Sequence, residues 1–265
     1  MPAARVNGHV IHYRLEGREQ QGGPTLAFSN SLGTDLRVWD PLLPHLPSDW
    51  RLLRYDTAGH GLSEHPGAYS IQDHAADLAG LLAELEIDAA VIVGLSIGGQ
   101  IAQALAAAQP RRIEGLVLCD TAPRIGEAAM WKHRIDGVRE TGLAAMSEAV
   151  LERWFTQKFR EERPDELALW RAMLVRTPAE SYTALCAALR DADLSASTAR
   201  IAKPTLCLVG DEDGSTPPAL VRAMAETIAG ARFEIISGAG HLPCVEAPEQ
   251  LASLIVDFMK EAQLA

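Results

Sequence analysis

Short apolar runs alternate along the chain with longer segments in which apolar side chains recur every three or four positions. The runs are typical of strands buried on both faces of a sheet, and the longer segments are typical of amphipathic helices. The apolar runs lie at 25–28, 51–55, 90–93, 115–119, 204–209 and 232–236. This alternation predicts a mainly parallel sheet with helices on both faces, which is an α/β fold.

The first part of the chain carries local signals for turns and helix starts. Asn7-Gly8 stands between two short alternating segments and predicts a hairpin, so the sheet begins antiparallel. Ser70 and Asp73 form a capping-box sequence, which predicts that a helix starts directly after Ser70. The apolar residues within 39–46 predict a short helix interrupted by prolines.

Residues 124–200 break the alternation. They contain several helical patterns, many charges, Trp131 and Trp154, but no convincing strand. We predict a core domain of residues 1–123 and 201–265, interrupted at 124–200 by a helical cap that packs over the edge of the sheet. The alternative is a separate helical domain, and it is disfavoured because the strand pattern resumes directly afterwards.

Composition and charge limit the classes of partner. The chain has 265 residues, enough for one large α/β domain, and its net charge of −11 argues against nucleic acid or an anionic membrane as a partner. A small anionic substrate is still allowed, because it needs only one or two local cations. No apolar stretch reaches the roughly 18 residues of a spanning helix, and residues 1–8 lack the apolar core of a signal peptide. We therefore expect a cytoplasmic protein.

The cysteines support the same expectation. Cys119, Cys186, Cys207 and Cys244 lie far apart, without the close spacing of a metal site. We expect four reduced thiols, with Cys119 and Cys207 in core strands. No cluster with metal-ligand spacing is visible in the sequence. The oligomeric state is not fixed by the sequence, which is compatible with a homo-oligomer.

The segment Gly94-Leu95-Ser96-Ile97-Gly98 carries the clearest chemical signal. It follows an apolar run and precedes a helical pattern, and this is the strand, sharp turn and helix of a nucleophile elbow. Both glycines are needed, because side chains at their positions would collide with neighbouring backbone. By chance alone G-x-S-x-G occurs in about one chain in ten of this size, and the surrounding strand and helix argue against that explanation.

A serine hydroxyl near neutral pH is a weak nucleophile, so it needs a base, and the base needs an orienting acid. In a parallel sheet these groups gather at the C-terminal ends of the strands. Asp213 follows the strand at 204–209, and His241 follows the strand at 232–236. The order Ser96, Asp213, His241 is that of hydrolases with an elbow, so these three residues are the predicted catalytic triad.

Other acids and histidines compete for these roles. Asp211 and Glu212 lie in the same loop as Asp213, but Asp213 has more reach from the strand end. Asp213 could instead be a turn residue or the N-cap of the helix that starts near Pro217. His241 could be a loop histidine bonded to backbone. We expect His60, which follows an earlier strand, to pack beside the site.

Acyl transfer also needs hydrogen-bond donors aimed at the developing oxyanion. The backbone N–H of Ile97, directly after the nucleophile, is one predicted donor. The loop after the first parallel strand, residues 29–33, should provide the second, and we assign it to the N–H of Leu32. The alternative is an ordinary strand-to-helix loop.

Several segments together resemble a known family. The chain resembles the α/β-hydrolase superfamily throughout its length and, within it, the 3-oxoadipate enol-lactonases. The segments that carry this resemblance are 29–35 with Trp39, 54–61, 94–99, 118–131 and 153–156. The sequence departs from the family at Ala58, where arginine is usual, and at Asp120, where asparagine is expected.

The resemblance implies an α/β-hydrolase fold with a mostly parallel eight-stranded sheet and a helical cap. It implies hydrolysis of 3-oxoadipate enol-lactone, a carboxymethyl butenolide, to 3-oxoadipate in the β-ketoadipate pathway of aromatic catabolism. A Ser-His-Asp acyl-enzyme mechanism needs no metal or organic cofactor. A general carboxylesterase and a cofactor-free haloperoxidase or perhydrolase share the same triad. A ligand-binding receptor with little turnover is a further alternative.

The carboxylate of such a substrate needs a cation inside an acidic protein. We predict that Arg134 from the cap binds it, because arginine forms bidentate bonds with carboxylates. Trp131 lies three residues earlier on the same helix face and would form an aromatic wall, with Trp154 as a weaker candidate. The alternative is that Arg134 is solvated and Trp131 packs the cap against the sheet.

Overall fold

One eight-stranded sheet organises the residues described by the computed structural model, which are 1–17 and 23–265. The strands lie in the order β1-β2-β4-β3-β5-β6-β7-β8. Their bounds are β1 (Ala3–Val6), β2 (His9–Glu16), β3 (Thr25–Ser29), β4 (Arg51–Tyr55), β5 (Ala90–Leu95), β6 (Ile113–Cys119), β7 (Thr205–Gly210) and β8 (Arg232–Ile236). Strand β2 pairs antiparallel with β1 and β4, and every other pair is parallel. The mostly parallel sheet with an antiparallel start is thus confirmed.

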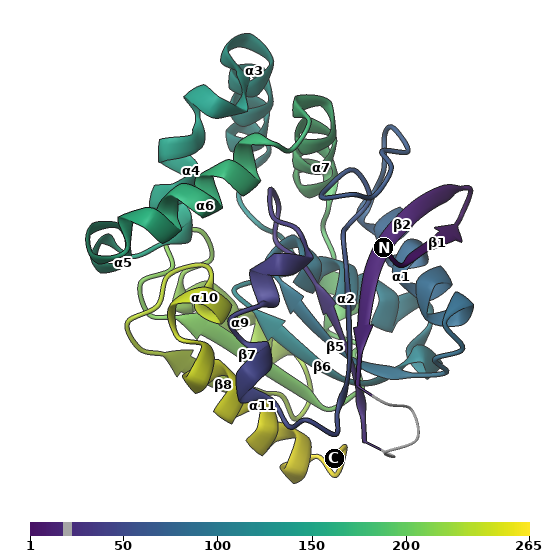
Figure 1. The fold of residues 1–265 in the computed structure, drawn as a ribbon. Helices are drawn as coiled ribbons and strands as arrows, with labels where there is room; N and C mark the ends of the chain where they lie inside the picture. The colour runs from purple at the N-terminus through teal and green to yellow at the C-terminus, as the bar shows by residue number, and fades with distance from the viewer. Residues whose placement is uncertain (18–22) are drawn as a thin grey trace.

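Helices cover both faces of the sheet (Figure 1). On one face α1 packs against α2, and on the other α11 packs against the short helix η3 (Leu43–His45). The bounds are α1 (Ile71–Glu84), α2 (Ile97–Ala108), α9 (Pro218–Thr227), α10 (Pro243–Glu246) and α11 (Pro248–Glu261). All side chains of β5 and β7 are buried, as expected for central strands between two helical layers.

The predicted turn and helix start are both confirmed. Asn7 and Gly8 have positive φ angles of 48° and 93° and connect β1 to β2, as a tight hairpin turn requires. The Ser70 side chain accepts from the Asp73 amide, and the Asp73 side chain accepts from the Ser70 amide. This reciprocal capping box satisfies two amides at the start of α1.

The short helix expected within 39–46 is interrupted by prolines, as predicted. The stretch contains parts of two short 3-10 helices, η2 (Leu36–Trp39) and η3 (Leu43–His45). Pro41 and Pro44 lack an amide hydrogen, so an α-helix across this stretch would lose two hydrogen-bond donors.

Residues 124–200 contain helices and no strand between β6 and β7. Figure 1 shows these helices as a layer above the sheet, and we call this segment the cap. Helix α3 packs against α7, and α4 packs against α6. The bounds are α3 (Ala128–Ala145), α4 (Ser147–Trp154), α5 (Gln157–Glu162), α6 (Pro164–Val175), α7 (Ala179–Asp191) and α8 (Ser195–Thr198).

Several titratable side chains lie in the interior. All four cysteines are buried and free of disulfides. His74 on α1 is also buried, with neither ring nitrogen hydrogen-bonded, and burial lowers its pKa to about 3. Within residues 1–17 and 23–265, no helix has the length and apolar character needed to cross a bilayer.

Candidate active site

Ser96 occupies a strained turn between β5 and α2. Its φ of 58° and ψ of −117° are disfavoured for a residue with a side chain. The turn is held because the Ser96 amide donates to the carbonyl of Cys119 on the neighbouring β6 at 2.9 Å. The Thr121 hydroxyl donates to the Ser96 carbonyl at 2.6 Å. These contacts fix the backbone of Ser96 on both sides of its Cα atom.

The two elbow glycines are required by close backbone contacts. A Cβ atom on Gly94 would collide with the carbonyl of Gly98. A Cβ atom on Gly98 would collide with the carbonyl of Ser29 at the end of β3. Neither neighbour is a flexible side chain, so the collision could not be relieved by a change of rotamer. The sequence spacing therefore reflects a steric need.

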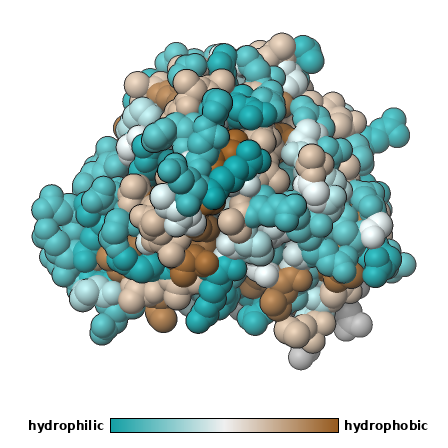
Figure 2. Space-filling view, turned by 90° about the horizontal axis from the view of Figure 1, so that it is seen from above, coloured by the Kyte–Doolittle hydropathy of each residue, from teal (hydrophilic) through white to brown (hydrophobic). Residues whose placement is uncertain are grey.

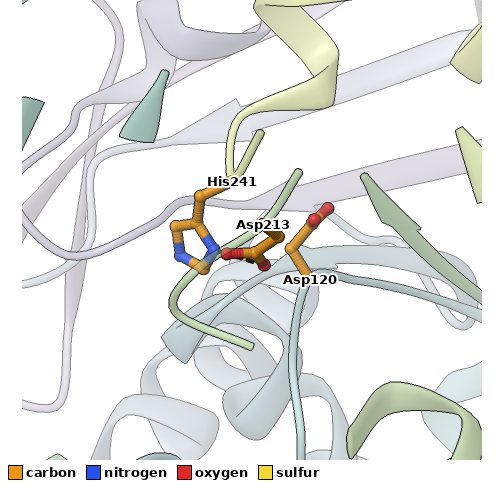
Figure 3. Close-up of side chains that lie close together, drawn as sticks. All are labelled: Asp120, Asp213 and His241. Atoms are coloured by element: carbon orange, nitrogen blue, oxygen red, sulfur yellow. Dashed lines mark hydrogen bonds and ion pairs between the residues drawn. The ribbon is translucent and has the colours of Figure 1, made fainter. Parts of the chain in front are cut away.

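Asp213 lies in the loop after β7 and contacts His241 (Figure 3). Its Oδ2 is 2.9 Å from Nδ1 of His241 and accepts from the Thr216 hydroxyl at 2.6 Å. Its Oδ1 accepts from the amides of Ser215 and Thr216 at 2.7 and 3.2 Å. Burial acts to raise the pKa of Asp213. His241 and these donors lower the pKa by more than burial raises it, so the pKa of Asp213 is about 2. Asp213 is therefore an ionised carboxylate at neutral pH.

The two competing acids in this loop are placed differently. Asp211 accepts from the hydroxyl of Ser237 at 3.1 Å and from the amide of Gly238 at 2.7 Å. Glu212 is exposed. Of the three acids in the loop, Asp213 is the one that contacts His241.

Ser96 and His241 line the same small cavity, which has a volume of about 50 Å³. No hydrogen bond between the Ser96 hydroxyl and the His241 ring is found in the described part of the chain. Since Nδ1 faces Asp213, Nε2 is the ring nitrogen left to take a proton from the hydroxyl. Such catalytic hydrogen bonds are often long in the free enzyme and tighten when substrate binds.

Two backbone amides near Ser96 are available as donors. Ile97 is the first residue of α2, so its amide has no acceptor within the helix. Within residues 1–17 and 23–265, the Leu32 amide likewise has no recorded acceptor. Among the described residues, neither predicted oxyanion donor therefore has an intramolecular acceptor, and Leu32 lines the cavity.

The loop that carries Leu32 is held from below by buried polar groups. The Gly33 amide donates to Nε2 of His60 at 3.0 Å, and the Asn30 side chain donates to the carbonyl of Tyr55 at 2.7 Å. Burial lowers the pKa of His60 to about 4, so its ring is neutral and can accept this bond. His60 thus lies beside the site and supports it, as the sequence predicted.

The three predicted substrate-binding residues of the cap also line the cavity. They are Trp131, Arg134 and Trp154. The Arg134 guanidinium lies 5.0 Å from the centroid of the Trp131 ring, a cation–π arrangement. The Trp131 indole N–H donates to the carbonyl of Ile125 at 2.6 Å, which fixes the ring. Seen from above, the molecule is mostly hydrophilic, with apolar side chains in recesses near the centre (Figure 2).

Arg153 and Tyr182 also line the cavity, and the sequence did not single out either of them for this role. Arg153 is exposed and comes from α4, and Tyr182 is buried on α7. Burial and the nearby Arg134 guanidinium lower the pKa of Arg153, so the two cations are close enough to repel. No aspartate or glutamate is among the described residues that line the cavity. In the sequence, Arg153 lies directly before Trp154, within the segment 153–156 that carries part of the resemblance.

Glu246 on α10 joins the cap to the loop that carries His241. Its Oε1 accepts from the amide and the hydroxyl of Thr156 at 3.0 and 2.7 Å. Its Oε2 accepts from the amide of Gly240 at 2.7 Å. One carboxylate thus satisfies donors at the start of α5 and directly before His241.

Asp120 is a second carboxyl group beside Asp213 (Figure 3). One donor atom each from Asp120, Asp213 and His241 lie within 4.8 Å of one another, and all three residues are buried. Carboxylates and imidazole are also metal ligands. However, Asp213 already accepts from four donors, and Nδ1 of His241 faces it. This arrangement favours a hydrogen-bonded cluster over a metal centre.

The chain is similar to several known proteins over almost its whole length. Residues 26–254 match the profile of the Alpha/beta hydrolase family. The chain is 35% identical to 3-oxoadipate enol-lactonase 2 of Acinetobacter baylyi, over 95% of this chain and 93% of that protein. The crystal structure of the enol-lactonase from Burkholderia xenovorans LB400 is similar with a TM-score of 0.95 and 41% identity, over 98% of this chain and 100% of that one. A malate-bound thermophilic esterase from Thermogutta terrifontis is similar with a TM-score of 0.90 and 28% identity, each chain being covered to 99%.

Proposed function

Because the chain belongs to the alpha/beta hydrolase family, in the group of the 3-oxoadipate enol-lactonases, we propose that it hydrolyses 3-oxoadipate enol-lactone to 3-oxoadipate. The protein is a hydrolytic enzyme that acts on an ester bond, and a lactone is a cyclic ester. The observation that carries the proposal is the cavity shared by Ser96, His241 and two arginines, with no aspartate or glutamate among its described lining residues.

The proposed reaction proceeds through an acyl-enzyme. Ser96 attacks the lactone carbonyl while Nε2 of His241 takes the hydroxyl proton, and Asp213 stabilises the resulting imidazolium. The ionised state of Asp213 and its contact with Nδ1 of His241 support this assignment. Collapse of the tetrahedral intermediate breaks the ring C–O bond, and the His241 imidazolium gives its proton to the leaving enol oxygen. The neutral His241 then takes a proton from water, which attacks the acyl-enzyme and releases the acid from Ser96.

The amides of Leu32 and Ile97 are the proposed oxyanion hole. Both belong to backbone that is fixed before substrate arrives: Leu32 precedes the Gly33 amide bonded to His60, and Ile97 begins α2. Donors that are already oriented need little reorganisation when negative charge develops on the substrate oxygen. The helix N-terminus at Ile97 adds a favourable electrostatic field.

The substrate carboxylate is proposed to bind between the cap and the catalytic serine. Arg134 and Arg153 supply two positive charges in a cavity whose described lining residues include no acid, although the whole chain has a net charge of −11. The ring of Trp131 holds the Arg134 guanidinium, and Trp154 provides a second aromatic wall. A small anion is the ligand that this local excess of positive charge favours.

The leaving group makes the reaction hard to reverse. Opening the ring releases an enol, which becomes a ketone, so the product is 3-oxoadipate. We place this step in the β-ketoadipate pathway of aromatic catabolism, in the cytoplasm, without a metal or organic cofactor. This placement rests on the resemblance to the enol-lactonases.

The test is a spectrophotometric assay of enol-lactone loss by the wild type and the Ser96→Ala variant. Removing the nucleophile should lower kcat by about 10⁴-fold or more, whereas the control Ser195→Ala, at an exposed position on α8, should leave it unchanged. The wild type should also react with a fluorophosphonate probe at Ser96. Hydrolysis of p-nitrophenyl acetate without lactone turnover would indicate a general carboxylesterase, and halide-dependent bromination with acetate and peroxide would indicate a perhydrolase. Lactone binding without turnover would indicate a receptor.

A further inference from the structure

Asp120 is a buried carboxyl group next to the proposed triad, and the mechanism above does not use it. It follows β6 directly, is fully buried, and has a positive φ of 48°. One of its oxygens lies within 4.8 Å of an Asp213 carboxylate oxygen and of a ring nitrogen of His241. Two ionised carboxylates at this distance in a dry interior would repel each other strongly.

The two carboxyl groups differ in the number of donors around them. Asp213 accepts from three N–H or O–H groups of Ser215 and Thr216 and faces Nδ1 of His241. Asp120 accepts from one donor, the amide of Gly210, at 3.0 Å, and its Oδ2 has no hydrogen-bond partner. Since donors stabilise the ionised form, the negative charge resides on Asp213.

The other titratable groups near Asp120 do not favour a second negative charge. They are Cys119 on the preceding strand and Cys244 and Glu246 on α10. Neither thiol nor carboxyl can contribute a positive charge, and His241 is already engaged by Asp213. Burial, followed by the charge of Asp213, raises the pKa of Asp120 well above its usual value.

We propose that Asp120 is a neutral carboxylic acid in the working enzyme, and that its O–H group donates a hydrogen bond to the Asp213 carboxylate. The inference rests on the triad assignment made above. Asp120 is then a positioning residue that acts through Asp213, since a fifth donor restrains the carboxylate that orients His241. Paired carboxyl groups in other sites likewise share one proton because their environments separate their pKa values. A neutral acid at this position can make the same hydrogen bonds as the asparagine that the resemblance led us to expect.

The test compares Asp120→Asn with Asp120→Leu. Asparagine can donate to Asp213 and accept from Gly210, so Asp120→Asn should retain kcat within about threefold and leave the acid limb of the pH–rate profile in place. Leucine removes the donor, so kcat should fall about 10–150-fold, the range for a hydrogen bond to a charged group, with little change in KM. The acid limb should also move to higher pH, because Asp213 without this donor attracts the His241 imidazolium more strongly.

The assay uses p-nitrophenyl acetate, so that it does not depend on the proposed lactone substrate. Labelling of Ser96 by a fluorophosphonate reports separately whether the nucleophile functions. A shift of the acid limb to lower pH in Asp120→Asn would mean that position 120 is charged in the wild type, and would overturn the proposal. Wild-type behaviour of Asp120→Leu would overturn it as well, because Asp213 would then not need the donor.

An infrared measurement keeps the proposal testable even if Asp120→Leu does not fold. The difference spectrum between the wild type and Asp120→Asn at neutral pH should contain the carbonyl stretch of a protonated carboxylic acid, shifted by deuteration. The absence of this band would refute the proposal. Exhaustive chelation should change neither the band nor the activity. A band that appears only after chelation would show that a metal ion, and not a proton, occupies the cluster.

Discussion

Replacing Arg134 by methionine tests how the cavity recognises its substrate. Methionine keeps an unbranched side chain that can still pack on the Trp131 ring, and it removes only the guanidinium. The half-buried Arg134 lines the cavity together with Ser96, and no acid among the described lining residues neutralises it. The substitution therefore removes one of two positive charges from the place where the substrate carboxylate is proposed to bind.

The expected size of the effect follows from the lost contact. A hydrogen bond between charged groups contributes about 1.5–3 kcal/mol, and about 1.4 kcal/mol corresponds to a factor of ten. The kcat/KM for the enol-lactone should therefore fall by about 10–150-fold. The loss should appear mainly in KM, because the carboxylate is bound equally in the ground state and the transition state. Arg153 remains in place, so the lower part of this range is expected.

The assay measures kcat and KM for the enol-lactone and for p-nitrophenyl acetate, which has no carboxylate. Activity toward the neutral ester should stay within about threefold of the wild type. The matched control is Lys132→Met, which removes the same charge from the same helix at an exposed residue paired with Asp136 at 2.5 Å. This control should leave kcat and KM unchanged for both substrates, since exposed ion pairs contribute little. An unchanged KM for the lactone in Arg134→Met, or an equal loss for both substrates, would refute the reasoning.

Two further predictions concern stability. The pKa of His74 is about 3 in the folded protein and about 6.5 in the unfolded chain. The free energy of unfolding therefore falls as the pH drops below 6.5, and at pH 5 the loss is about 2 kcal/mol. His74→Leu should remove this loss. Urea midpoints of the wild type and the variant at pH 7.5 and pH 5 measure it, and equal pH dependence in both proteins would contradict the argument. In Gly98→Ala the added Cβ meets the Ser29 carbonyl, so stability should fall by about 3 kcal/mol or more and labelling of Ser96 should be lost. The control Gly137→Ala, whose Cβ meets only the flexible Met146 side chain, should fold normally by thermal denaturation; equal melting temperatures for the two variants would sink the steric argument.

The sequence was most informative where local pattern determines structure. The elbow around Ser96 could be predicted because its strand, turn and helix are contiguous. Asp213 and His241 could be placed beside it because parallel strands end at the same edge of the sheet. The greater reach of Asp213 compared with Asp211 also agrees with the contact seen at His241.

The sequence was least informative where separate helices meet. Arg153 and Tyr182 reach the cavity through the packing of α4 and α7, and helical periodicity does not specify which helices face each other. His74 could not be recognised as buried from the pattern, because a single polar residue on an apolar helix face does not change the periodicity. The contact between Thr156 and Glu246 spans 90 residues and has no local signature. Only the assembled fold shows these features.

The carboxylate of Glu246 limits how far this enzyme can diversify. Relatives or engineered chimaeras that exchange residues 124–200 for another insertion must supply new hydrogen-bond donors for Oε1 of Glu246. In this protein both of its donors, an amide and a hydroxyl, belong to Thr156. An insertion without them would leave one oxygen of a half-buried carboxylate without its donors, at the residue that also anchors the Gly240 amide. A graft chosen only to alter substrate preference would then also disturb the position of the general base. Exchange of the insertion and of position 246 must therefore be made together.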